Sequence, residues 1–199
     1  MNLIRLVKPV CIGALALLSG CASDPPTQFF ALRAQAEPVT AAMPEELVND
    51  SFGVGPVRIS APLAKTGIVS FQSNNQLVIS AYNIWAANLP ESIAEVIVED
   101  FTAMTGNPRI QPHPWDSRTR PSRQLRLYIE RFDGQLGGEV TLRCKWSLLE
   151  ERGKREVATG LIGLSGHTGE PGYPAYVATM NNLLTRLSEQ LFEAISLHM

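Results

Sequence analysis

The sequence contains little cysteine, histidine or charge. Its 199 residues include three cysteines and three histidines, and charged side chains make up 18%. The 17 positive side chains are outnumbered by 19 negative ones, which argues against nucleic acid as a partner. The histidines are dispersed and neither H-E-x-x-H nor C-x-x-C occurs, so no metal site or other cofactor is predicted.

The N-terminal apolar run is too short to span a bilayer, which takes about 20 residues. This run, at residues 10–18, follows two cations and is typical of a secretory signal peptide. It ends in "LSGC", a leucine and two small residues before Cys21, which resembles the lipobox of bacterial lipoproteins. We therefore expect residues 1–20 to be removed and Cys21 to carry a diacylglycerol and an N-acyl chain. The alternative is an uncleaved N-terminal helix with a chance cysteine.

An acylated Cys21 predicts a firm membrane attachment, because two lipid signals anchor a protein stably where one acyl chain does not. The next residue is Ala22 rather than aspartate, and the resemblance to lipoproteins then implies the outer membrane. Residues 21–28 are polar and contain proline, as expected of a tether. The folded domain is predicted to face the periplasm.

Cys11 is expected to leave with the signal peptide and Cys21 to carry lipid, so the remaining cysteine, Cys144, has no partner for a disulfide. It lies in a segment where apolar and polar residues alternate, as in a strand with one buried face. The expected buried positions are Val140, Leu142, Cys144, Trp146 and Leu148. We expect a buried structural thiol rather than a reactive one.

The pattern of the whole chain predicts a single α/β domain over residues 29–199. Its fold class is a mixed, largely antiparallel sheet with two main helices packed on it. One helix is expected from Pro90 to the stop at Gly106 and another at the C-terminus, and residues 33–50 are expected to be mostly loop. Strands are expected at 29–32, at 52–60 with a bulge near Gly53, Gly55 and Pro56, at 77–80, and as three consecutive antiparallel strands across 123–166.

Four segments together resemble one known family. They are "VGPV" at 54–57, "WAANL" at 85–89, "RFDG" at 131–134 and the strand that contains Trp146. In this order, after a lipobox, they are similar to the ABC-type transport auxiliary lipoproteins, the PqiC (paraquat-inducible protein C) family. The similarity covers nearly all of the chain after the signal peptide. The sequence departs from the family pattern at Ser60 and at Ala87-Asn88.

The resemblance implies a function in lipid transport. It implies an outer-membrane lipoprotein that docks an MCE-domain membrane protein, in some systems with an ABC transporter, and supports lipid movement between membranes. It also implies a ring-like homo-oligomer, since the MCE partners form rings. The alternative is a periplasm-facing lipoprotein that binds lipid itself as a carrier or acts as an assembly factor. An enclosed apolar cavity would favour the carrier.

Five side chains are candidates for partner binding, because Trp and Arg are enriched at interface hot spots. Trp85 and Trp115 are expected near loops, and the segment "RTRPSR" contributes Arg118, Arg120 and Arg123 for an acidic partner or anionic headgroups. The alternatives are tryptophans that cover the domain's own core and a solvated charged loop.

An enzyme is not predicted. The segment "GLSGH" at 163–167 nearly matches the G-x-S-x-G nucleophile elbow, but its fifth residue is His167 rather than glycine. The elbow also needs a strand that leads into a helix, and here a Gly-rich loop is expected after the strand.

We expect Cys21→Ser to block acylation and to release the domain from membranes, because the thiol forms the thioether to the lipid. Membrane fractionation with mass spectrometry of the N-terminus would measure both effects. Tight membrane attachment of the variant would contradict the tether.

Overall fold

A computed structural model of the chain describes residues 24–38, 45–73 and 75–198. The predicted signal peptide and Cys21 lie outside these residues. No helix of the described part is long and apolar enough to cross a membrane.

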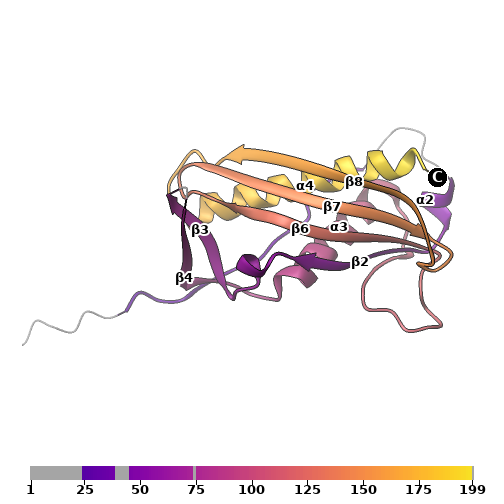
Figure 1. Cartoon of the computed structure of the whole chain (residues 1–199), viewed down its shortest axis with the longest axis horizontal. Helices are drawn as coiled ribbons and strands as arrows, with labels where there is room; N and C mark the ends of the chain where they lie inside the picture. Colours follow the sequence, from indigo (N-terminus) through magenta and orange to yellow (C-terminus); the bar gives the residue numbers. More distant parts are fainter. Residues whose placement is uncertain (1–23, 39–44, 74, 199) are drawn as a thin grey trace, which may run out of the picture.

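The larger of two sheets forms the body of the molecule (Figure 1). β2 runs parallel to β5 and β6, whereas β6, β7 and β8 form an antiparallel meander. The register shifts between Val54 and Val57, so the predicted bulge is present, and Gly55 there has a φ of 121°. The spatial order is β5 (Ile110–Pro112), β2 (Phe52–Ile59), β6 (Arg123–Gly134), β7 (Glu139–Glu150) and β8 (Arg155–His167).

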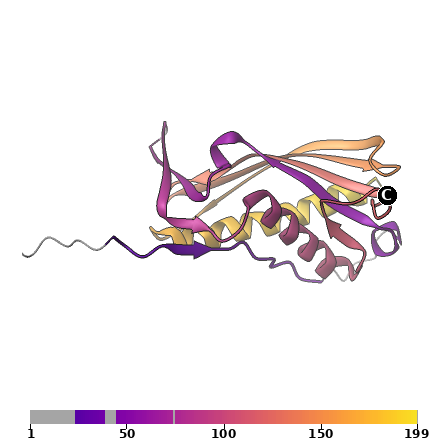
Figure 2. The same ribbon diagram turned by 90° about the horizontal axis from the view of Figure 1, so that it is seen from below.

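Two long helices cover one face of this sheet (Figure 2). α3 (Leu89–Thr105) packs on β2 and β5, and α4 (Tyr173–Ser196) packs on β7 and β8. α3 ends at Gly106, whose φ of 69° is the left-handed conformation that glycine tolerates best at a helix C-terminus. The buried stripe of α4 consists of Tyr176, Val177, Met180, Leu183, Leu184, Leu187, Leu191 and Ile195.

A smaller sheet stands at one end of the larger one (Figures 1 and 2). Its order is β1 (Gln28–Phe30), β4 (Gln76–Trp85) and β3 (Gly67–Ser73), with β1 parallel and β3 antiparallel to β4. The buried Tyr176 hydroxyl donates a hydrogen bond of 2.9 Å to the carbonyl of Val69. This bond joins β3 to α4 and so holds the smaller sheet on the core.

Buried polar side chains fix the segment that follows β1. The carboxylate of Asp100, on α3, accepts the N–H groups of Gln35 and Ala36, both at 3.0 Å. Ser188, on α4, donates to the same carboxylate at 2.7 Å. These bonds satisfy backbone groups that no strand partner reaches.

The fold-class prediction is confirmed, and both long helices lie where the sequence placed them. β3 was not predicted, because its first four residues are buried on both faces and give no period-2 pattern. β4 is longer than the predicted strand at 77–80. The short helix α2 (Glu45–Asn49) lies inside the expected loop, where Leu47 is buried against the core.

Cys144 lies in the core between the sheet and the helices, as the alternation predicted. Burial raises the pKa of its thiol to about 12. The thiolate is the reactive form, so Cys144 is a structural residue.

We expect Asp100→Ala to lower the free energy of unfolding by about 2 kcal/mol, because it removes the acceptor of two part-buried N–H groups and of the buried Ser188 hydroxyl. Urea denaturation measures this loss. The matched control is Glu99→Ala, at an exposed neighbouring position, with an expected change below about 0.5 kcal/mol. Equal effects of the two substitutions would contradict the role given to Asp100.

We expect Cys144 in a folded protein that carries Cys11→Ser and Cys21→Ser to be nearly inert to thiol reagents at pH 8. With a pKa raised to about 12, only about one thiol in ten thousand is ionised at that pH. The reaction should become fast only after unfolding, when the pKa returns toward its usual value. Absorbance of a released chromophore measures both rates, and fast reaction of the folded protein would contradict the burial.

Candidate functional site

Neither long helix covers the face of the larger sheet opposite α3 and α4, and we call it the open face (Figure 2). On β6 the buried Leu125, Leu127 and Ile129 alternate with Arg126 and Tyr128, which are exposed. The same alternation places the polar side chains of β7 on this face. The open face therefore consists of strand residues that the core does not use.

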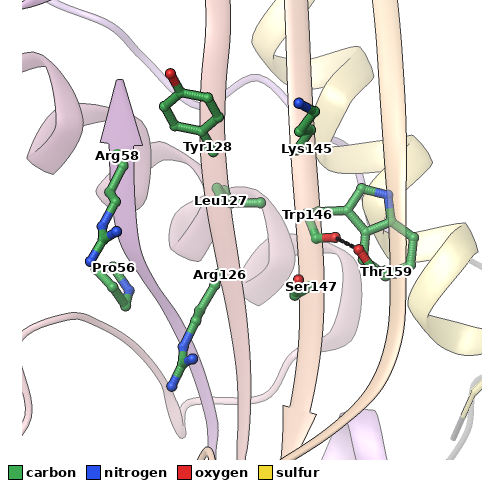
Figure 3. A pocket seen from close by; sticks show the side chains of 9 residues that line it. All are labelled: Pro56, Arg58, Arg126, Leu127, Tyr128, Lys145, Trp146, Ser147 and Thr159. Carbon is green, nitrogen blue, oxygen red and sulfur yellow. Dashed lines mark hydrogen bonds between the residues drawn. The ribbon is translucent and has the colours of Figure 1, made fainter. Parts of the chain in front are cut away.

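A groove of about 570 Å³ lies on the open face (Figure 3). The floor includes Leu127 and Trp146, which are buried. Its rim comes from four adjacent strands and combines cations with hydroxyl groups: Arg58 from β2, Arg126 and Tyr128 from β6, Lys145 and Ser147 from β7, and Thr159 from β8. The Thr159 hydroxyl donates to the carbonyl of Trp146 at 2.9 Å, which ties β8 to β7 at the groove.

The groove has an excess of positive charge. Glu130 is the carboxylate beside it and is already paired, with Arg143 at 3.1 Å and with Lys145. The hydrogen bond from Lys145 lowers the pKa of Glu130, so this carboxylate stays ionised. Among the described residues, no carboxylate pairs with Arg58 or Arg126. Their guanidinium groups can bind carboxylates or phosphates with two parallel hydrogen bonds.

Of the two tryptophans proposed for partner binding, Trp85 is the last residue of β4 and is 7% exposed. It belongs to the hydrophobic core, which favours the structural alternative. Trp115 is half-buried in the loop after β5, edge-on to His113 with ring centroids 5.1 Å apart. A Cβ on Gly53 would collide with its indole, so this glycine makes room for the ring.

The three arginines of "RTRPSR" differ in their surroundings. Arg123 bridges Asp50 at 2.6 Å and Glu150 at 3.2 Å, which fixes the start of β6 and favours a structural role. Arg118 and Arg120 are exposed. The carboxylate of Asp116 orders their loop by accepting the N–H groups of Arg118 at 2.7 Å and Thr119 at 2.8 Å, and these bonds lower its pKa.

The residues of the elbow-like segment do not form a nucleophile elbow. Ser165 lies within β8, and α4 begins only at Tyr173, so no strand leads directly into a helix at this serine. The Ser165 carbonyl accepts a bond of 3.0 Å from Arg186, and the Nδ1 atom of His167 accepts the N–H of Gly169 at 3.1 Å. In the described part of the chain, no group of three or more His, Cys, Asp or Glu side chains could hold a metal ion.

None of the five side chains proposed from the sequence for partner binding lines the groove. The alternation of β7 already separates Arg143 and Lys145 from the buried face. Nothing local indicates that Arg58 lies beside them, because β2 reaches β6 through a pairing of residues about 70 positions apart. The one sequence signal for the groove is that each of these strands has a cation at a position that alternates with its apolar residues.

Comparisons with solved structures support the fold. A crystal structure of an uncharacterized protein shares 18% identity with a TM-score of 0.66, over 86% of this chain and 100% of that one. A DUF330-family protein from Xanthomonas campestris shares 16% sequence identity with a TM-score of 0.69, over 82% of this chain and 92% of that one. A PelC dodecamer from Paraburkholderia phytofirmans has a TM-score of only 0.44 at 12% sequence identity, over 79% of this chain and 94% of that one. This similarity is too low to indicate how the present chain assembles. No curated protein matches the sequence.

The sequence itself matches one family model over most of its length. The match extends over residues 30–191 and so includes β2 to β8, all of α3 and most of α4. The chain therefore belongs to the family described as the ABC-type transport auxiliary lipoprotein component, as its sequence motifs predicted.

Proposed function

We propose that this protein is an outer-membrane lipoprotein that docks an MCE-type membrane protein of an ABC-linked lipid transport system. The family description supports a lipid anchor and a role beside a transporter. The docking role rests on one observation, the groove of the open face, where Arg58 and Arg126 have no carboxylate partner in the described chain. In a chain with a net charge of −2, such a cationic surface favours an acidic partner surface.

The placement of the two ends is compatible with this role. The segment that leads to Cys21 leaves at the end formed by the smaller sheet, and the loop at 113–122 lies at the opposite end (Figure 1). With Cys21 acylated, that loop points away from the outer membrane and toward a partner anchored in the inner membrane. Arg118, Arg120 and Trp115 are therefore proposed as a second part of the docking surface.

The alternative role, a carrier that binds lipid itself, has less support. A carrier shields acyl chains in a concave, mostly apolar pocket. The groove of the open face is instead open to solvent and is bordered by three cations. A ring-like homo-oligomer stays a prediction of the family resemblance.

We expect charge reversal in the groove, Arg58→Glu with Arg126→Glu, to reduce capture of the MCE partner at least about tenfold. Placing like charges opposite each other costs several kcal/mol, and each 1.4 kcal/mol corresponds to about a factor of ten. The measurement is a pull-down from envelope extract with the acylated protein in detergent, with the MCE protein identified and quantified by mass spectrometry.

The matched control carries the same change in charge on exposed residues outside the groove, Arg33→Glu with Lys65→Glu. This variant should capture as much partner as the wild type. If Arg118→Glu with Arg120→Glu abolishes capture and the groove variant does not, the loop is the docking surface. Absence of any MCE protein from the wild-type pull-down, with Cys21 acylated, would contradict the proposed function.

A further inference from the structure

The β3–β4 hairpin carries no charge, although alternate residues in the first part of β4 are exposed. Residues 66–90 contain no Asp, Glu, Lys, Arg or His, although charged residues make up 18% of the chain. This stretch forms β3 and β4 of the smaller sheet. Edge hairpins usually carry charges that keep them from associating, so a hairpin without charge is suited to a less polar environment than water.

Exposed apolar side chains gather at the same end of the molecule. Ile79 and Leu77 of β4 are 47% and 36% exposed, and Phe29 of the neighbouring β1 is 68% exposed. Leu136, 37% exposed, lies in the β6–β7 turn, which touches β3 through the bridge between Phe71 and Gln135. We call Phe29, Leu77, Ile79 and Leu136 the apolar end. Leu77 and Ile79 lie beside β3, whereas Phe29 pairs with Ile84 near the other end of β4, so the exposed apolar side chains are spread along the smaller sheet. Exposed apolar surface gathered at one end of a molecule is typical of an interaction site.

The length of the N-terminal segment identifies what this end meets. Cys21 precedes Gln28, the first residue of β1, by seven positions. Even a fully extended segment of that length spans only about 25 Å. A bilayer that holds acyl chains on Cys21 therefore lies within about 25 Å of β1, which pairs directly with β4.

We propose that the apolar end lies in the headgroup region of the bilayer that anchors Cys21, so that the protein contacts the membrane both through lipid and through side chains. This inference rests on the acyl anchor of the proposed function. The lipid chains alone leave the domain free to rotate on its tether. The second contact fixes the orientation of the domain, because the Tyr176 bond to Val69 joins the hairpin to the core. The groove of the open face then has a constant orientation relative to the membrane.

The test places an environment-sensitive fluorophore at Ile79→Cys in the full acylated protein, anchored in vesicles of phosphatidylethanolamine and phosphatidylglycerol. Acylation blocks Cys21 and burial protects Cys144, so the introduced thiol is the one that reacts. The matched control is the same label at Leu161→Cys on β8, a leucine that is 50% exposed, against 47% for Ile79. We expect the emission at position 79 to shift to shorter wavelength on anchoring, and the emission at position 161 to stay at its value in water.

Flotation of the same vesicles separates the two hypotheses. If the acylated protein floats with the vesicles but the emission at position 79 does not shift, the membrane contact is wrong and the anchor stands. If the acylated protein does not float, both are wrong. A shift at position 79 that depends on protein concentration, in Cys21→Ser protein without vesicles, would assign the apolar end to a second copy of the chain and overturn the proposal.

Discussion

The structure depends on burial of one face of the five-stranded sheet under two helices. A sheet with one apolar face must cover it, and α3 and α4 do so with continuous apolar stripes. Tyr176 on α4 also fixes the smaller sheet, through its bond to Val69. The fold of the whole domain therefore depends on the packing of α4, and loss of this packing would release both sheets.

The same constraint explains why a polar surface is available for function. Both long helices pack on one side of the sheet. The strand residues that alternate with the buried ones, among them Arg126, Tyr128 and Lys145, therefore lie on the other side. The pairing of β6 with β7 fixes the backbone positions from which these side chains project. A groove built on a sheet of four adjacent strands is preorganised, which lowers the entropic cost of binding a partner.

The ends of the molecule have opposite character. The end from which the N-terminal segment leaves carries the uncharged β3–β4 hairpin, whereas the loop at 113–122, with the exposed Arg118 and Arg120, lies at the opposite end (Figure 1). Under the proposed function, this difference separates a membrane side from a partner side.

The sequence alone determined the fold class, both long helices, the β6–β8 meander and the buried position of Cys144, because helical and strand periodicities are local. It also determined the family, because "VGPV", "RFDG" and the other motifs are contiguous. Only the tertiary structure decided which polar residues are available. Trp85 is buried and Arg123 is ion-paired, while Arg58 joins the groove, since each depends on contacts with residues far away in the chain. Strand pairing over long separations leaves no trace in any short segment, and so the site could not be predicted.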